Sequence, residues 1–235
     1  MTATLRSPAP PMLPWTELDV AQLPEGGQLR LMRRGGEFSI KLGIAELMTS
    51  RVFGSEEALA TLAAERLKAR TAPRVLIGGL GMGFTLRAAQ AAFGAQARIV
   101  IAELVPAVVR WARGPMAALF GGCLDRPGAE LVEADVAALI QAAKPPYDAI
   151  LLDVDNGPEA MTRTANDGLY SPRGLALARA ALTPGGVLAV WSQGPDRAFA
   201  KRLEKAGFKV EEKPVRARGA RGGARHVIWL GVRTG

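Results

Sequence analysis

Residues 74–87 read Arg74-Val-Leu-Ile-Gly-Gly-Leu-Gly-Met-Gly-Phe-Thr-Leu-Arg87. A short apolar stretch with β-branched residues runs into a glycine cluster and then into a helical pattern, which is typical of a strand, a tight loop and a helix. Glycines at positions 79, 81 and 83 let the backbone turn sharply and keep side chains away from a ligand. The unpaired N–H groups and the positive dipole end of the helix would face that ligand.

An acid follows at the end of the next predicted strand. The run Arg98-Ile-Val-Ile-Ala leads into Glu103, which is placed to accept hydrogen bonds from two ribose hydroxyls. Strand, loop, helix, strand and acid together predict a nucleoside-binding βαβ unit. The spacing Gly79-x-Gly81-x-Gly83 differs from the G-x-G-x-x-G of dinucleotide folds and favours a binder of an adenosyl sulfonium. The alternative is a tight turn in a doubly wound domain with an unrelated ligand.

Composition bounds the class of protein. A chain of 235 residues, 49% hydrophobic and 22% charged, fits one globular α/β domain with an appendage. Its one cysteine, Cys123, and one histidine, His226, exclude an internal disulfide and multi-cysteine or multi-histidine metal sites. A sole histidine on a distant strand also argues against a Ser-His-Asp hydrolase. No segment approaches the roughly 18–20 apolar residues of a membrane span, so we expect a cytoplasmic protein.

The net charge of +8 raises nucleic acid as a partner. The densest basic cluster is Lys213-Pro-Val-Arg-Ala-Arg-Gly-Ala-Arg-Gly-Gly-Ala-Arg225, which lies between two predicted strands and contains no aromatic residue. This pattern favours a solvated hairpin tip, and nucleic-acid binding remains the lesser alternative.

Three regions follow from the patterning. Residues 1–14 are proline-rich and predict a disordered lead. Residues 15–70 predict a small β-hairpin element, which turns at Gly35-Gly36, followed by a helix in which Ser55 is the N-cap. Residues 71–235 predict an α/β domain that binds a nucleoside.

Strands and helices alternate in the third region. This alternation predicts a doubly wound, mostly parallel, seven-stranded sheet, in which the runs 208–215 and 226–232 form an antiparallel pair at one edge. Ligands bind such sheets at the carboxyl ends of the strands. Glu103, Asp135 and Asp153 each fall at such an end.

Several segments resemble the spermidine synthase (polyamine aminopropyltransferase) family, which has the class I methyltransferase-like fold. Val75–Arg87 aligns without gaps to the family pattern V-L-I-I-G-G-G-D-G-G-T-L-R. Glu103-Leu-Val-Pro106 resembles its E-x-D-P ribose segment, and Tyr147–Asp153 resembles Y-D-x-I-x-x-D. Further counterparts are Asp135, Leu169-Tyr170, Leu182-Thr-Pro-Gly-Gly186 and Gln193.

The resemblance implies a site for decarboxylated S-adenosylmethionine, or for S-adenosylmethionine itself, without a metal. The donor-binding residues that it implies are Gly79, Gly81, Met82, Gly83, Glu103, Asp135 and Asp153. Glu103 would bind the ribose and Asp135 the adenine amine. The resemblance also implies a small amine as acceptor and a homodimer.

The chain departs from the family pattern in its amine-binding half. Met82 stands where the family loop carries an aspartate that receives the donor's amine, a charge-assisted bond of about 1.5–3 kcal/mol. The segment 153–158 is two residues shorter than the family's, so Asp155 or Asn156 must replace its second aspartate. The family's N-terminal glutamine has no counterpart between Lys41 and Arg51.

Three residues are candidates for the chemistry. Asp153 is the predicted base or amine orienter, with a helix cap as its alternative. Tyr170 would position an amine, or else serve the core, and Asp155 would replace the second carboxylate, or else brace an Asx turn. Met82 would contact the donor or fill the loop.

We therefore expect an aminopropyl-type transferase that uses an adenosyl sulfonium donor. The first alternative is a methyltransferase on the same fold, which the loss of the loop aspartate favours because intact S-adenosylmethionine brings its own carboxylate. The second is a non-catalytic nucleoside-binding or RNA-binding relative.

Overall fold

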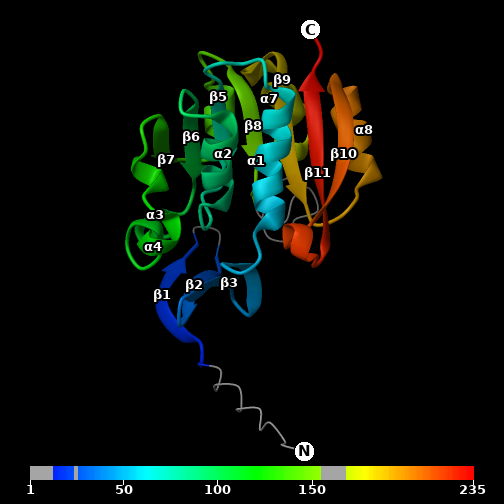
Figure 1. The fold of residues 1–235 in the computed structure, drawn as a ribbon. Coiled ribbons are helices and arrows are strands. Elements are labelled where there is room, and N and C mark those ends of the chain that lie inside the picture. Colours follow the sequence, from blue (N-terminus) through cyan, green and yellow to red (C-terminus); the bar gives the residue numbers. More distant parts are fainter. Residues whose placement is uncertain (1–12, 24–25, 155–167) are drawn as a thin grey trace, which may run out of the picture. The chain divides into compact units, whose positions relative to one another are not determined.

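The computed structural model describes residues 13–23, 26–154 and 168–235. The chain divides into two compact units, the first ending at Thr49 and the second beginning at Ser50 (Figure 1). The first unit holds a four-stranded antiparallel sheet in the order β1-β2-β3-β4. These strands are β1 (Thr16–Gln22), β2 (Gln28–Arg34), β3 (Glu37–Leu42) and β4 (Ala45–Thr49).

The hairpin predicted around Gly35-Gly36 is confirmed. Strands β2 and β3 pair with Arg34 opposite Glu37, and Gly35 takes a φ of +58° at the tip. The alternating apolar residues of these two strands are buried, as their spacing predicts: Leu29, Leu31, Phe38 and Ile40. The flanking strands β1 and β4 were not predicted. β1 is exposed at every position except Ala21, so its alternating Leu18 and Val20 are not buried, whereas β4 is exposed only at Ala45 and Glu46 and is too short to show a clear alternation.

The second unit contains the predicted seven-stranded sheet, in the order β10-β11-β9-β8-β5-β6-β7 over the described residues. Five strands are parallel, while β11 is antiparallel to β9 and β10 is antiparallel to β11, which confirms the predicted edge pair. The strands are β5 (Arg74–Gly78), β6 (Arg98–Glu103), β7 (Ala129–Glu133), β8 (Tyr147–Leu152), β9 (Leu182–Ser192), β10 (Phe208–Arg216) and β11 (Arg225–Arg233).

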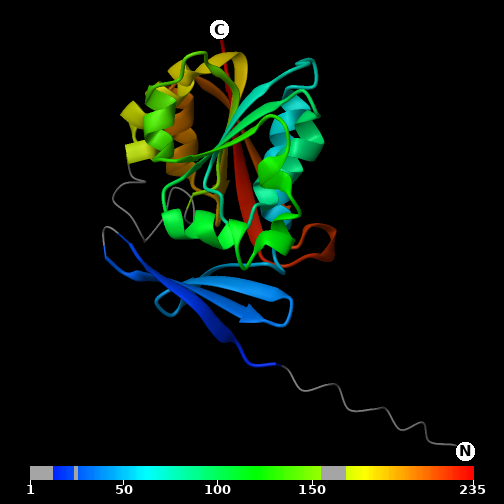
Figure 2. The ribbon, with the colours of Figure 1, turned by 90° about the vertical axis from the view of Figure 1, so that its left-hand side faces the viewer.

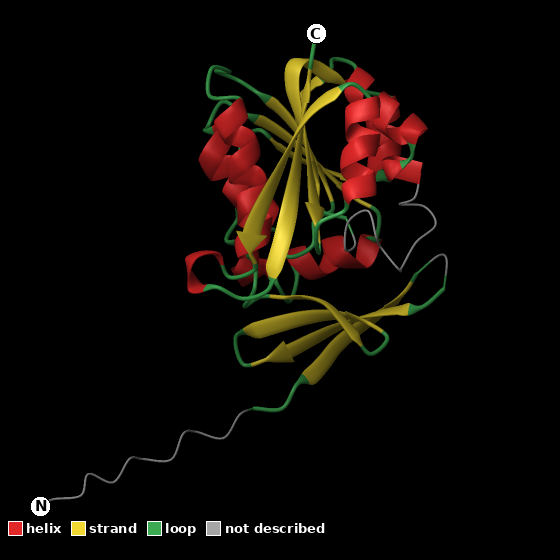
Figure 3. Cartoon of the chain, turned by 90° about the vertical axis from the view of Figure 1, so that its right-hand side faces the viewer, coloured by secondary structure: helices red, strands yellow, loops and turns green. Residues whose placement is uncertain are grey.

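Helices cover both faces of this sheet (Figures 2 and 3). On one face α1 packs on α2 and lies over β8 to β11, while α5, α7 and α8 cover the other face. The helices are α1 (Gly54–Arg66), α2 (Phe84–Phe93), α3 (Pro106–Arg113), α4 (Ala117–Phe120), α5 (Val136–Gln141), α7 (Pro172–Ala181) and α8 (Arg197–Lys205), with 3₁₀ turns η1 (Cys123–Asp125) and η3 (Gly219–Arg221). Among the described helices, none is long and apolar enough to cross a membrane.

The central strands are buried on both faces because helices cover both sides of the sheet. The run Tyr147–Leu152 is buried at every position, and Val75, Leu76 and Ile77 of β5 are fully buried. Continuous apolar runs of this kind are typical of parallel sheets. Each such side chain contributes about 1.5–3 kcal/mol relative to exposure, so the sheet is a rigid base for whatever lies at its edge.

The start of α1 differs from the prediction. The helix begins at Gly54 after an N-cap at Phe53, and Ser55 is not the cap. The backbone N–H of Gly54 donates to the Ala217 carbonyl at 2.8 Å, and a Cβ on Gly54 would lie 2.2 Å from the backbone nitrogen of Gly219. This long-range contact with the β10–β11 connection fixes where the helix starts. It also places α1 with the second unit, whereas the sequence pattern grouped this helix with the β element.

Candidate active site at the carboxyl edge of the sheet

The predicted acids lie at the ends of neighbouring parallel strands. Glu103 is the last residue of β6, Asp153 directly follows β8, and β5 runs between these two strands. The glycine loop that leaves β5 therefore starts between Glu103 and Asp153. Asp135 follows β7, the next strand beyond β6. The sheet thus brings to one edge the three acids that the sequence selected.

Glu103 holds the glycine loop. Its Oε2 accepts the backbone N–H of Leu80 at 3.0 Å, and its Oε1 accepts the N–H of Val105 at 2.8 Å. The side chain is buried, at 7% exposure. A carboxylate accepts about four hydrogen bonds, so Glu103 can hold the loop and bind hydroxyls at the same time. The contact of Glu103 with ribose hydroxyls is compatible with these two hydrogen bonds and stays a prediction.

The glycines of the loop are required by the protein's own packing. Gly79, Gly81 and Gly83 have φ values of +89°, +49° and +75°. A Cβ on Gly79 would lie 2.6 Å from the carbonyl oxygen of Asp153, and one on Gly83 would lie 2.5 Å from the ring of Phe120. These contacts add a structural reason for glycine at two of the three positions, beside the predicted clearance for a ligand.

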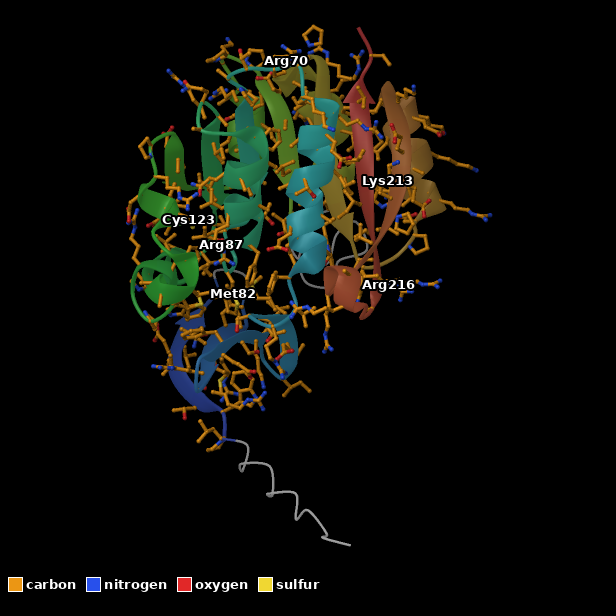
Figure 4. The ribbon with its side chains drawn as sticks, in the orientation of Figure 1. Arg70, Met82, Arg87, Cys123, Lys213 and Arg216 are labelled. Carbon is orange, nitrogen blue, oxygen red and sulfur yellow. The ribbon has the colours of Figure 1, made fainter. Side chains whose placement is uncertain are left out.

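Met82 is almost completely buried, at 2% exposure. Figure 4 shows it at the N-terminal end of α2, below Arg87. Burial of a thioether fits the alternative in which Met82 fills the loop. The predicted contact with the donor is not tested by this placement. In either case the loop itself supplies no carboxylate at this position.

Asp135 is exposed and caps α5. Its Oδ1 accepts the backbone N–H of Ala137 at 2.8 Å, which satisfies one of the orphan donors of that helix. Its predicted contact with an adenine amine is compatible with this role, because a carboxylate has further acceptor sites. That contact remains a prediction.

The side chain of Asp153 contacts the first turn of α2. Its Oδ2 accepts the hydroxyl of Thr85 at 2.7 Å, and Thr85 is the second residue of α2. The Thr85 hydroxyl also lies 3.4 Å from the backbone carbonyl oxygen of Glu56. One threonine therefore joins the end of β8 to the first turn of α1. The partly buried Asp153 stays the predicted base.

Glu56 belongs to this site, and the sequence reasoning did not select it. Its Oε2 accepts the hydroxyl of Ser55 at 2.7 Å. Burial, and then the nearby charge of Asp153, raise the pKa of Glu56 from 4.5 to about 7, although the Ser55 hydrogen bond acts in the opposite direction. The edge thus holds two interacting carboxyl groups, one of which is partly protonated near neutral pH.

The position of α1 in the chain could have pointed to Glu56. A helix that leads directly into a strand of a parallel sheet and covers that sheet runs opposite to the parallel strands, so its first turn lies at their carboxyl ends. In the sequence, however, Glu56 and Glu57 look alike as acids of a first helical turn. The structure separates them, because Glu56 is partly buried and Glu57 is exposed.

His226 lies beside Ser55, although the two residues are far apart in the sequence. The Nδ1 of His226 lies 3.0 Å from the Ser55 hydroxyl, and its ring packs edge-on against Trp191 with centroids 4.8 Å apart. Burial lowers the pKa of His226. The distant histidine therefore lies beside a serine, a contact that the sequence alone did not show. The exclusion of a Ser-His-Asp hydrolase still holds, since Ser55 is 1% exposed and Glu56 binds the serine instead of the histidine.

The remaining candidates are less defined. Tyr170 is buried at 4% exposure and packs edge-on against Phe199, with centroids 5.5 Å apart, which fits its core alternative. Its role toward an amine stays a prediction. Asp155 and Asn156 lie outside the described residues. Within the described part of the chain, no group of three or more His, Cys, Asp or Glu side chains is arranged to hold a metal ion.

The residues present fit an adenosyl donor. Glu103 offers a buried carboxylate for hydroxyls, and the following helix α2 begins after Gly83 without a side-chain cap. Because the N-cap residue is a glycine, it has no side chain to cap the first-turn N–H groups, which is compatible with a bound ligand there.

Sequence comparison identifies polyamine aminopropyltransferases as relatives. The chain is 34% identical over 146 residues to polyamine aminopropyltransferase 1 of Streptomyces coelicolor, which covers 59% of this chain and 27% of that protein. It is 35% identical over 125 residues to the polyamine aminopropyltransferase of Mycobacterium tuberculosis, or 52% of this chain and 23% of that one. The chain thus matches about a quarter of the length of these relatives. No family model matches the sequence.

Structural comparison identifies the fold. A spermidine synthase in complex with the transition-state analogue AdoDATO superposes with a TM-score of 0.73 at 19% identity, covering 92% of this chain and 72% of the other. The spermidine synthase of Thermotoga maritima gives a TM-score of 0.74 at 20% identity with the same coverage. The predicted spermidine synthase-like, methyltransferase-like fold is confirmed.

Proposed function

We propose that this chain, spermidine synthase-like in fold and similar in sequence to polyamine aminopropyltransferases, transfers an aminopropyl group to a small amine. The donor would be decarboxylated S-adenosylmethionine. The observation that carries this proposal is the pair of carboxyl groups, Glu56 and Asp153, beside a glycine loop held by Glu103. Carboxyl groups at this edge suit cationic amines better than any anionic substrate.

The donor half of the proposed site would consist of Glu103, Asp135 and the glycine loop. Glu103 would bind the ribose hydroxyls, Asp135 the adenine amine, and the loop from Gly79 to Gly83 would lie against the rest of the nucleoside. When bound, the donor supplies an alkyl carbon that is already activated by the sulfonium. The protein therefore needs to orient the nucleophile, exclude water and take up a proton.

The acceptor half depends on Asp153. An alkylamine is protonated near neutral pH and has to lose a proton before it can attack. Asp153 would accept a hydrogen bond from the amine and then its proton, while Thr85 keeps the carboxylate oriented through its 2.7 Å bond. Tyr170 and Asp155 remain candidates for holding the far end of the amine.

Met82 favours a second candidate, a methyltransferase, because the loop lacks the family's aspartate. Glu56 weakens that argument. It provides a second carboxyl group at the same edge, contributed by α1 in place of the loop. A site with two carboxyl groups also disfavours the carboxylate of intact S-adenosylmethionine, since like charges repel at short range.

Binding measurements separate these functions. Calorimetric titration of the protein with decarboxylated S-adenosylmethionine, intact S-adenosylmethionine and methylthioadenosine should give the tightest binding for the decarboxylated form. Preference for the intact form would contradict aminopropyl transfer and favour methyl transfer. Binding of none of the three would overturn the nucleoside site itself.

A further inference from the structure

A line of hydrogen bonds leaves the acid pair through residues that the proposed chemistry does not use. Ser55 donates to Glu56 Oε2 at 2.7 Å, and the Ser55 Oγ lies 3.0 Å from His226 Nδ1. Ser55 is 1% exposed, whereas His226 is only partly buried. The line therefore begins at a buried acid and ends at a side chain that reaches solvent.

Backbone packing holds the two ends of this line in place. Ser55 follows Gly54, whose N–H donates to the carbonyl of Ala217 at 2.8 Å, directly after β10. His226 lies near the start of β11 and packs edge-on against Trp191. Because the sheet and this contact fix both elements, the serine and the histidine remain within hydrogen-bond distance.

The charges around the line suit proton movement. Asp153 and Glu57 are the acids that raise the pKa of Glu56, and burial lowers the pKa of His226, so its imidazole is neutral at pH 7. On the strands that carry and neighbour His226, the nearest cations in sequence are Arg225 and its strand partner Arg216, both exposed. A neutral imidazole can accept a proton, and its lowered basicity favours passing it on.

We propose that Ser55 and His226 carry to solvent the proton released by the transfer reaction. This inference rests on the proposed function. The ammonium form of the acceptor loses one proton, its nitrogen forms a bond to the alkyl carbon, and the carbon–sulfur bond breaks to leave methylthioadenosine. One proton is left over for each turnover.

The relay accounts for that proton at each atom. The amine's proton passes to Asp153 and then, through a water molecule between the two carboxyl groups, to Glu56, whose titration is affected by the charge of Asp153. The proton of Glu56 moves to the Ser55 oxygen while the serine's own proton moves to His226 Nδ1. His226 then loses a proton to water from its other ring nitrogen. Asp153, Glu56 and Ser55 return to their starting protonation states, and the imidazole, left with its proton on Nδ1, regains the other tautomer by proton exchange with water before the next turnover.

Two substitutions interrupt the line while both acids stay in place, although Ser55→Ala also removes the hydrogen bond that Glu56 accepts. Ser55→Ala removes the bridging hydroxyl, and His226→Asn keeps a polar group near Ser55 but cannot carry a proton. Thr61→Ala is the matched control, because Thr61 lies exposed on the same helix and bonds only the helix backbone. Decarboxylated S-adenosylmethionine and 1,4-diaminobutane serve as substrates, with product followed by mass spectrometry between pH 6 and 9.

In both relay variants we expect kcat to fall roughly tenfold or more, with methylthioadenosine binding unchanged. Added imidazole should restore much of the lost rate, since a diffusible base can take over the proton. A purely structural bridge would not respond to imidazole.

Three results would overturn the relay. Wild-type rates in Ser55→Ala and His226→Asn across the pH range would contradict it, and so would a loss that imidazole does not restore. If the wild-type protein transfers nothing while it binds the donor, the proposed function fails, and the relay falls with it. The first two results leave the proposed function standing.

Discussion

At the scale of single residues, four carboxyl groups at one edge of the sheet do different work. Glu103 binds two backbone N–H groups, Asp135 caps a helix, Asp153 accepts a threonine hydroxyl, and Glu56 accepts a serine hydroxyl. Only the first three could be selected from the sequence, because each ends a predicted strand. Glu56 is selected by burial and by its neighbour Asp153, which depend on the folded structure.

Replacing Glu103 by Gln should weaken both the loop and the nucleoside site. The amide has one acceptor oxygen, so it cannot serve the N–H groups of Leu80 and Val105 together. We expect a loss of about 1–3 kcal/mol in unfolding free energy and a similar loss in methylthioadenosine binding. Denaturant unfolding and calorimetry measure the two.

Glu133→Gln is the matched control for that substitution, because Glu133 pairs with Glu103 in the sheet and is exposed. It should leave both quantities nearly unchanged. Equal effects from the two substitutions would mean that Glu103 has no special role.

Glu56 should make the protein less stable as pH rises. Its pKa is about 7 in the folded state and 4.5 when the group is unperturbed, as in the unfolded chain. Between these pH values the folded state therefore binds more protons than the unfolded state. This contribution is fully present below pH 4.5 and is lost as pH rises through 7. Glu56→Gln should therefore remove a decline of roughly 2–3 kcal/mol over this window.

The measurement is the free energy of unfolding of the wild-type protein and of Glu56→Gln from pH 4.5 to 8, with Glu57→Gln as the control variant. His226 acts in the opposite direction, because its lowered pKa costs stability as pH falls below 6.5. Since His226 is present in all three proteins, the difference between them isolates Glu56. Parallel curves for wild type and Glu56→Gln would show that Glu56 titrates normally.

At the scale of elements, the glycine loop packs directly against Asp153, the predicted base. Gly79→Ala would place a methyl group 2.6 Å from the Asp153 carbonyl, at a φ of +89°. We expect a loss of at least 2 kcal/mol in stability, an order-of-magnitude figure for strain plus a backbone clash. Turnover of the folded fraction should fall as well, because Asp153 shifts.

Gly121→Ala provides the comparison, since Gly121 has a φ of +57° with open space around its Cβ position. It should cost only about 1 kcal/mol and leave turnover intact. If the two variants behave alike in thermal unfolding and in turnover, the contact between the loop and Asp153 is unimportant.

The boundaries of the helices and strands show which structural signals are local in the sequence and which depend on contacts between distant residues. The helix that begins after Ser171 could be predicted from its cap and first-turn proline, because those signals are local. The cap assigned to Ser55 was wrong, because contact with the segment 217–219, far away in sequence, fixes the start of α1. The alternation of strands and helices predicted the mostly parallel sheet and its antiparallel edge pair, while the outer strands β1 and β4 were not predicted.

At the scale of the whole molecule, the net charge of +8 includes a basic connection between β10 and β11. Figure 4 shows Lys213 and Arg216 on β10, and Arg216, Arg218 and Arg221 are all exposed. Replacing these three arginines by alanine should change the unfolding free energy by less than about 0.5 kcal/mol per site and leave turnover unchanged.

Retention on an RNA column tests the alternative that this basic connection binds nucleic acid. We expect little retention at physiological salt, with whatever remains at low salt reduced in the triple variant. Strong binding at physiological salt that the variant loses would make the connection a nucleic-acid surface.

Direct product detection tests whether this edge of the sheet performs aminopropyl transfer. Purified protein is incubated with decarboxylated S-adenosylmethionine and a panel of diamines, and methylthioadenosine and the extended amine are quantified by mass spectrometry. We expect equal amounts of both products, and a loss of at least a hundredfold in Asp153→Asn, the scale of a missing general base. No extended amine with any diamine, or full activity in Asp153→Asn, would contradict it.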